Sequence, residues 1–146
     1  MWAPGDVLVF DWGEIGPLFV FCAVLAWSRW RFVSFADNLG ASSTMAALAQ
    51  CMETIGGVAK TLLTDRMGCL KAGTVAGVVI PTPAYVRFVT HYGTRPDFCE
   101  GADPASKAWA TDYTSWWVDG EDVVCSAGDP RWRGGRTHPV ARRRAA

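Results

Sequence analysis

The sequence has no net charge, no closely spaced cysteine pair and no apolar run long enough to cross a membrane. Its 14 basic and 14 acidic residues balance, so overall charge neither favours nor excludes a nucleic-acid partner. The longest apolar run, Leu18 to Trp27, is about half as long as a membrane-spanning helix. The N-terminus lacks the basic region and the small-residue cleavage site of a signal peptide. We therefore expect a soluble, intracellular protein without a membrane partner.

The cysteines are odd in number and widely spaced, and none forms a Cys-x-x-Cys pair. This usage is typical of reduced cytosolic residues, several of them in core positions, rather than of a metal site. The five are Cys22, Cys51, Cys69, Cys99 and Cys125. At 146 residues, 50% of them hydrophobic, the chain is long enough for one compact domain with its own core.

Three apolar segments near the start predict neighbouring strands. Val7 to Phe10 is a short continuous run of strand formers bounded by glycines, which is typical of a central strand buried on both faces. Leu18 to Trp27 and Arg29 to Phe35 follow, with Ser28 as the turn between them. Together they predict a meander of antiparallel strands.

The pattern then alternates between helical and strand character. Apolar residues recur at helical spacing after Ser42-Ser43 until Gly56-Gly57 ends the segment, which predicts a capped amphipathic helix. Val58 to Thr64 is strand-like. Thr82-Pro83 offers an N-cap and a first-turn proline for a second helix, which Gly93 ends.

A further strand and helix complete the predicted core. Thr94 to Cys99 is strand-like, and Pro96 confines that strand to an edge or an end of the sheet. Asp103-Pro104 then begins a third helix. A meander followed by helical crossovers predicts an α/β fold, a mixed sheet with helices packed on it.

The character of the sequence changes after Lys107. Tryptophan, glycine and arginine accumulate there without helical or strand periodicity, so we expect an irregular or disordered tail. From Pro130 onward there are six arginines and no acidic residue. We therefore divide the chain into an incomplete core, residues 1–107, and a divergent tail, residues 108–146.

Two aspartates lie at the ends of predicted core strands. Asp11 follows the first strand and Asp65 the fourth; the other interpretation of Asp11 is a solvated turn residue beside Gly13. Strand ends of an open mixed sheet form a crevice, and two carboxylates brought together there repel one another unless a cation lies between them. Mg²⁺ or Mn²⁺ prefers such an oxygen-only environment, and two such ions serve phosphoryl transfer on DNA.

Four segments follow one another in the order found in a known family. They are Asp11 to Glu14, Phe21 to Arg29, Thr64 to Gly68 and His91 to Cys99. Together they resemble the catalytic core of insertion sequence 21 family (IstA-like) transposases, which belong to the retroviral integrase superfamily. The resemblance covers roughly Gly5 to Lys107.

The resemblance implies an RNase H-like mixed sheet and a DDE site, an Asp, Asp, Glu triad that binds two divalent cations, Mg²⁺ or Mn²⁺. It makes Asp11 the first catalytic carboxylate and Asp65 the second, both as metal ligands. In relatives the third is a Glu in a Ser-Lys-Gly-x-x-Glu pattern that leads into a helix. This chain has Ser106-Lys107 followed by Thr111 at the Glu position.

Asp112 is the nearest candidate for the missing third acid. It lies one residue beyond Thr111, and one helical step rotates a side chain by about 100° and advances it by about 1.5 Å. Asp112 therefore takes the place of the Glu only on a distorted helix. Glu121 is a second candidate, through a fold of the tail that the sequence does not predict.

The activity implied by the resemblance is metal-dependent DNA nicking and strand transfer, the chemistry of transposition and DNA integration. Its partners are the transposon ends, the target DNA, further copies of the chain and an ATPase encoded by the same element, in the bacterial cytoplasm and at the nucleoid. Family members carry an N-terminal DNA-binding region, and the family pattern is lost after Lys107, so we expect this chain to be truncated at both ends. The tail is rich in arginine and tryptophan and has no pattern after a well-patterned core, so we expect it to derive from a shifted reading frame.

Two other functions stay open at this point. One is a catalytically inactive transposase remnant that keeps a DNA-binding or self-association surface, because the third carboxylate is missing or displaced. The other is a stand-alone ribonuclease H-like hydrolase, which shares the geometry but not the family motifs.

Several further side chains each allow two interpretations. Trp12, Trp27 and Trp30 suit either core packing or stacking on bases. His91 suits either a helix C-terminus or the site, and Glu14 either a turn or the rim of the metal site. The arginines after Pro130 suit either a solvated tail or contacts with phosphates.

Overall fold

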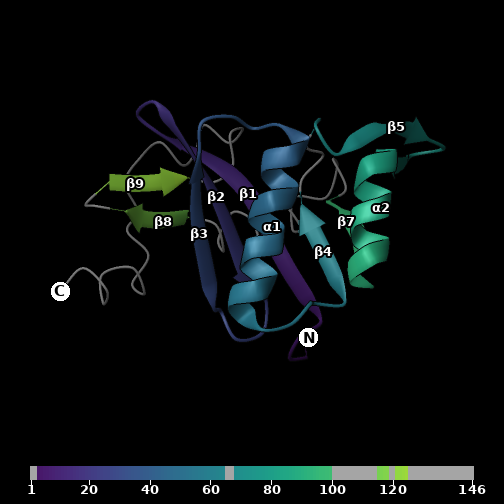
Figure 1. Cartoon of the computed structure of the whole chain (residues 1–146), viewed down its shortest axis with the longest axis horizontal. Coiled ribbons are helices and arrows are strands. Elements are labelled where there is room, and N and C mark those ends of the chain that lie inside the picture. The colour runs from purple at the N-terminus through teal and green to yellow at the C-terminus, as the bar shows by residue number, and fades with distance from the viewer. Residues whose placement is uncertain (1–2, 65–67, 100–114, 119–120, 125–146) are drawn as a thin grey trace.

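The computed structural model describes residues 3–64, 68–99, 115–118 and 121–124. They form a five-stranded mixed sheet of order β3-β2-β1-β4-β7, two helices and two separate hairpins (Figure 1). The sheet strands are β1 (Val7–Ile15), β2 (Leu18–Leu25), β3 (Arg31–Ala36), β4 (Thr61–Thr64) and β7 (Arg95–Phe98). The other elements are α1 (Ala41–Ile55), α2 (Pro83–Tyr92), β5 (Lys71–Val75), β6 (Val78–Pro81), β8 (Ser115–Val118) and β9 (Glu121–Val124).

The sheet combines an antiparallel half with a parallel half. β1 pairs antiparallel with β2, and β2 with β3, so the predicted meander is confirmed. β4 and β7 continue the sheet parallel to β1, because each is reached through a helix that crosses one face. The predicted α/β mixed sheet is therefore correct, and Pro96 lies on the edge strand β7 as predicted.

The helix boundaries follow the predicted signals with one exception. The Thr82 side chain accepts a hydrogen bond from Tyr85 N (3.3 Å), Pro83 opens α2, and Gly93 ends it in the left-handed region. Gly56 ends α1 in the same way. The prediction that α1 begins after Ser42-Ser43 is wrong, because the helix starts at Ala41 with Gly40 as its N-cap.

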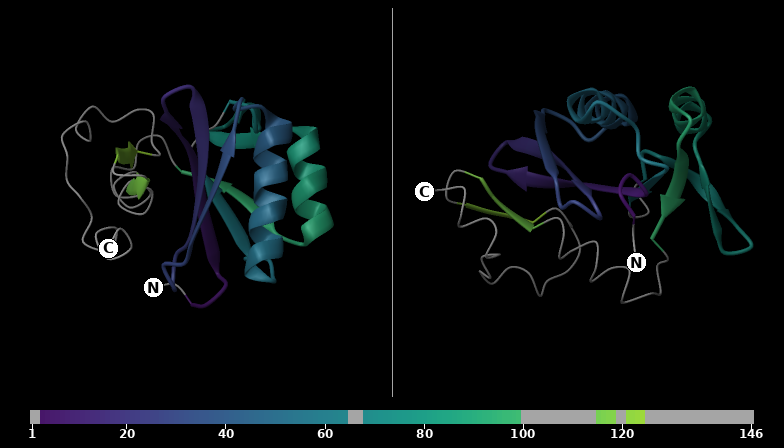
Figure 2. Two further views of the ribbon diagram at one scale, coloured as in Figure 1. Left: turned by 60° about the vertical axis from the view of Figure 1, so that its left-hand side comes forward. Right: turned by 90° about the horizontal axis from the view of Figure 1, so that it is seen from below.

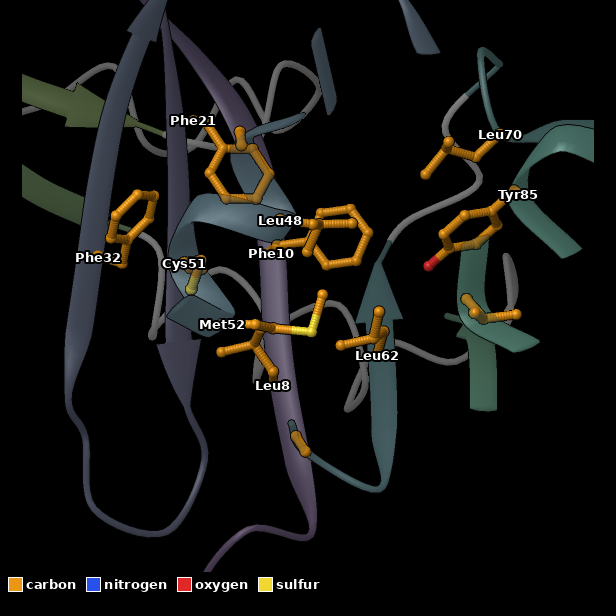
Figure 3. Close-up of a cluster of buried hydrophobic side chains, with 14 of the residues drawn as sticks. Leu8, Phe10, Phe21, Phe32, Leu48, Cys51, Met52, Leu62, Leu70 and Tyr85 are labelled. Atoms are coloured by element: carbon orange, nitrogen blue, oxygen red, sulfur yellow. The ribbon is translucent and has the colours of Figure 1, made fainter. Parts of the chain in front are cut away.

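The main core lies between the sheet and the two helices (Figure 3). Phe21 packs edge-on against Trp12, with ring centroids 5.3 Å apart. The buried Trp12 indole donates to Thr44 Oγ1 (3.0 Å) on α1, so its polar atom is satisfied within the core. The cluster includes Leu8, Phe10, Phe21, Phe32, Leu48, Cys51, Met52, Leu62, Leu70 and Tyr85.

The sequence did not predict either of the two hairpins. β5 and β6 form an antiparallel ribbon whose turn contains Ala76 and Gly77, both with positive φ, the backbone pattern of a tight hairpin turn. β8 and β9 form the second ribbon, so the tail that lacked a periodic pattern contains one regular element. The third predicted helix, from Asp103-Pro104, lies outside the described residues. Neither helix in the described part of the chain is long and apolar enough to cross a membrane.

Candidate active site

Asp11 lies inside strand β1 rather than after it. The buried run Val7 to Phe10 continues without a break through Asp11 and Trp12 to Ile15. The interpretation of Asp11 as a turn residue beside Gly13 is therefore wrong, because both residues pair in register with β2. Asp11 pairs with Cys22 of β2, and the same strand pairs with β4 from Val7 to Val9. The backbone that carries the carboxylate is therefore fixed in the sheet.

The alternation of side chains along β1 places Asp11 on the face of the sheet opposite the helices. Leu8, Phe10 and Trp12 belong to the helix-side core, whereas Val7 and Val9 form a separate cluster with Ala26 and Leu63. Because side chains two residues apart share a face, Asp11 projects on the side of Val7 and Val9. We call this side, which carries Val7, Val9 and Asp11, the Asp11 face.

The Asp11 side chain is partly buried, and one of its oxygens is engaged locally. Trp12 N donates to Asp11 Oδ1 at 2.7 Å, and the directly opposite residue on β2 is Cys22. Such a carboxylate suits a hard divalent cation, which takes oxygen ligands and tolerates partial exposure. Among the residues that the structure describes, no group of three or more His, Cys, Asp or Glu side chains gathers to hold a metal ion.

The second and third predicted acids, Asp65 and Asp112, lie outside the described residues, as does Thr111. Strand β4 is described up to Thr64, the residue directly before Asp65 in the chain. Thr64 is 1% exposed, and its Oγ1 has no hydrogen-bond partner. The alternative third acid, Glu121, begins β9, a strand that contacts β1.

One carboxylate on the Asp11 face was not singled out from the sequence. The register pairs Val9 with Leu63 and Leu63 with Asp97, so the exposed Asp97 on β7 shares the face of Asp11. Two strand spacings sideways and two residues along the strand separate them by roughly 12 Å. One cation does not bridge that distance with oxygen ligands at about 2.1 Å. The alternation of side chains along β7 shows which face Asp97 lies on, but only after the strand order and register are known.

The exposed fraction of each side chain decides between most of the alternative interpretations of the tryptophans and Glu14. Trp12 is a core residue, 6% exposed, so its base-stacking interpretation is wrong. Trp27 is exposed at 58%, and Trp30 stacks on Phe32. Glu14 is an exposed residue of β1, not of a turn.

His91 and the cysteines give two further outcomes. His91 lies in the last turn of α2, the position expected for a partner of the helix dipole. The prediction that every cysteine is reduced is wrong for Cys22, which is disulfide-bonded. Cys51, Cys69 and Cys99 form no disulfide. Cys125 and the arginines after Pro130 lie outside the described residues.

Comparison with known structures identifies the fold. The catalytic core domain of BIV integrase superposes with a TM-score of 0.57 at 12% identity, over 75% of this chain and 64% of that one. The HTLV-2 integrase catalytic core domain in complex with magnesium gives 0.53 at 15% identity, over 64% and 59%. The fold is that of a retroviral integrase catalytic core. The simian T-cell lymphotropic virus intasome also matches, with a TM-score of 0.56 at 13% identity, over 73% of this chain and 36% of that one.

Comparison of sequences leads to the same superfamily. The chain is 30% identical over 105 residues to a putative transposase for insertion sequence element IS5376 of Geobacillus stearothermophilus. The aligned part is 66% of this chain and 26% of that transposase, so the chain spans about a quarter of its relative. No protein-family model matches the sequence. The two likenesses together support a place in the transposase and integrase superfamily, with the RNase H-like mixed sheet as its core.

Proposed function

We propose that this chain is part of the catalytic core of a DNA transposase of the insertion sequence 21 family, which nicks DNA and transfers strands in transposition. The observation that carries the proposal is Asp11, a partly buried carboxylate inside the central strand of an integrase-core fold. The similarity to a bacterial insertion-sequence transposase gives the class of reaction. The same similarity supports a bacterial cytoplasmic location.

In this proposal Asp11 and Asp65 are the metal-binding pair. The parallel register pairs Val7 with Thr61 and Val9 with Leu63. Asp65 follows directly on Thr64, the last residue of the strand that pairs with β1. Carboxylates from neighbouring strands share divalent cations readily, because each oxygen binds at about 2.1 Å. The magnesium complex of the HTLV-2 integrase core supports the choice of metal.

The two ions, when bound, would activate the attacking oxygen and stabilise the leaving oxygen of the phosphodiester. The chain's own contribution is the rigid placement of the ligands. Asp11 pairs in register with Cys22 of β2, and the hydrogen bond from Trp12 N to Oδ1 fixes one carboxylate oxygen. Such fixed placement limits the reorganisation needed when the phosphate arrives.

Asp112 is the third acid that we propose for an active chain. Thr111 stands where relatives have Glu, and a hydroxyl is a poor substitute for a carboxylate at a Mg²⁺ site. Residues 1–107 would form the core and residues 108–146 a divergent tail. DNA ends, target DNA, further copies of the chain and the element's ATPase would be its partners, and the intasome similarity supports the assembly on DNA.

A nicking assay tests the proposal. Wild-type protein is incubated with supercoiled plasmid that carries the ends of its own element, with Mg²⁺ or Mn²⁺, and compared with Asp11→Asn. We expect nicking by the wild type and a loss of at least a hundredfold in the variant. Two matched controls keep their activity: Glu14→Gln, an exposed acid of the same strand, and Asp97→Asn, which shares the Asp11 face. Equal nicking by wild type and Asp11→Asn would overturn the proposal.

A catalytically inactive remnant is the second candidate, and Thr111 at the Glu position favours it. Placing a glutamate at position 111 distinguishes an active transposase from an inactive remnant. If Thr111→Glu gains Mg²⁺-dependent nicking that the wild type lacks, the chain is a remnant with an intact scaffold. If Asp112→Asn removes nicking that the wild type has, Asp112 is the third acid and the chain is an enzyme.

A further inference from the structure

The part of the Asp11 face formed by β1 and β2 is largely buried although neither helix lies on it. Val9, Val20, Cys22 and Val24 are each at most 1% exposed, and the register places all four on the side of Asp11. Both helices pack against the opposite face (Figure 2). Something other than α1 and α2 therefore covers the Asp11 face.

The described element on this side of the sheet is the β8–β9 hairpin. Both views in Figure 2 place its two strands across the sheet from the helices, and β9 lies against β1, the strand of Asp11. The sequence of the hairpin is rich in apolar residues, which a ribbon that lies on a sheet requires. They are Trp116, Trp117, Val118, Val123 and Val124.

We propose that the β8–β9 hairpin is an autoinhibitory cover, which closes the Asp11 face and keeps DNA from the Asp11 carboxylate. Packed layers of β-structure lie about 10 Å apart. A phosphate joined to Asp11 through a divalent cation lies much closer, since each metal–oxygen distance is about 2.1 Å. The hairpin and a DNA phosphate therefore exclude one another at this face.

The charges of β9 act in the same direction. Glu121 and Asp122 place two acidic residues in the strand that lies against β1, and like charges repel a DNA backbone. Inhibition, as distinct from the covering itself, rests on the proposed transposase function. The hairpin must leave, or shift, before the chain can act on DNA.

Carboxylate footprinting measures the covering directly and needs neither metal nor DNA. The full-length protein is treated with a water-soluble carbodiimide and an amine, and the modification of Asp11 is quantified by mass spectrometry against that of Glu14. Glu14 is exposed on the same strand and serves as the internal reference. We expect a low Asp11 to Glu14 ratio in the wild type.

Two proline variants form a matched pair. Val123→Pro and Val79→Pro each remove a backbone donor from a two-stranded hairpin, where Val123 pairs with Trp116 and Val79 with Thr74. Val123→Pro is expected to raise the Asp11 to Glu14 ratio at least fivefold, and Val79→Pro to leave it unchanged. An unchanged ratio in Val123→Pro overturns the proposal, and so does an equal rise in both variants.

Global unfolding is detected in the same samples through Cys51, which is fully buried in the helix-side core and resists alkylation while the domain is folded. If Val123→Pro exposes Cys51, the double variant Val123→Ser/Val124→Ser replaces it, because it removes apolar surface but keeps the backbone donors. A raised ratio there supports the cover, and an unchanged ratio overturns it.

Nicking activity separates this proposal from the proposed function. If Val123→Pro raises both the ratio and Mg²⁺-dependent nicking, the autoinhibitory cover is supported. If the Asp11 to Glu14 ratio rises but no variant nicks DNA, the hairpin does cover Asp11. In that case the proposed transposase function is wrong, and so is the inhibition that rests on it. If the ratio stays unchanged while the wild type nicks DNA, the function stands and the cover fails.

Discussion

The two faces of the central sheet are built from the same strands but serve different purposes. On the helix side, Phe10, Trp12 and Phe21 meet residues of α1 in a cluster in which the Trp12 indole nitrogen donates to Thr44. On the other side, the same strand β1 presents Val9 and then Asp11. One step along the strand separates a side chain that holds the domain together from one suited to chemistry.

The difference teaches that the scaffold and the site are separable. Because neighbouring residues of β1 point to opposite faces, a change at Asp11 leaves the helix-side packing untouched, and a change at Phe10 leaves the carboxylate face unchanged except through loss of the fold. Four predictions test this separation, from the largest expected effect to the smallest.

Phe10→Ala removes a fully buried ring from the helix side. We expect a loss of about 3 to 5 kcal/mol in the free energy of unfolding, a large share of the about 5 to 15 kcal/mol typical of a domain. Phe35→Ala is the matched control, since Phe35 is 51% exposed and should change stability by no more than about 0.5 kcal/mol. Urea denaturation measures both. Similar losses in the two variants would show that the faces do not differ as described.

Divalent cations should stabilise the protein through the Asp11 face. A ligand that binds only the folded state adds about 2.7 kcal/mol at a hundred times its Kd. Thermal unfolding with increasing Mg²⁺ or Mn²⁺ should therefore show a rising Tm for the wild type and for Asp97→Asn, and little change for Asp11→Asn. If all three proteins respond alike, Asp11 is not a metal ligand.

Thr44→Val leaves the buried Trp12 N–H without its acceptor, because Thr44 Oγ1 receives that bond at 3.0 Å. An unsatisfied buried donor costs about 1 to 3 kcal/mol. Ser43→Ala, one residue earlier on the exposed side of α1, loses a hydrogen bond to Asn38 and serves as the control, with an expected change of no more than about 0.5 kcal/mol. Urea unfolding followed by tryptophan fluorescence compares them. Equal costs would contradict the structural role of the Trp12 to Thr44 bond.

Because Cys51 is buried on the helix side of the sheet, we also predict a loss of stability at alkaline pH. Burial raises the pKa of the Cys51 thiol from 9.0 to about 12. A folded-state pKa above the unfolded one gives stability that is complete below about pH 9 and declines as the pH rises toward 12, because only the unfolded thiol ionises in that window. Cys51→Ala should show a shallower decline of unfolding free energy between pH 9 and 11. Parallel pH profiles for the two proteins would refute this contribution.

The kinds of element and most of their ends followed from local sequence signals. Thr82, Pro83 and Gly93 marked α2 because capping is a contact between residues close in the chain. The β5–β6 hairpin was missed because the first residue of its Ala76-Gly77 turn is alanine, where glycine or asparagine usually adopts the positive φ. The β8–β9 hairpin was missed because its tryptophans and acids show no regular alternation.

For the site, the sequence by itself determined that Asp11 and Asp65 each follow a run predicted as a core strand. The family resemblance made both of them metal ligands and added Asp112. Only the tertiary structure decided that Asp11 is inside the strand, that it projects away from the helices, and that Asp97 shares its face while β9 lies against its strand. Those facts depend on strand order and register, which arise from contacts between residues far apart in the chain. Local sequence patterns specify which element forms; long-range pairing specifies which side chains meet.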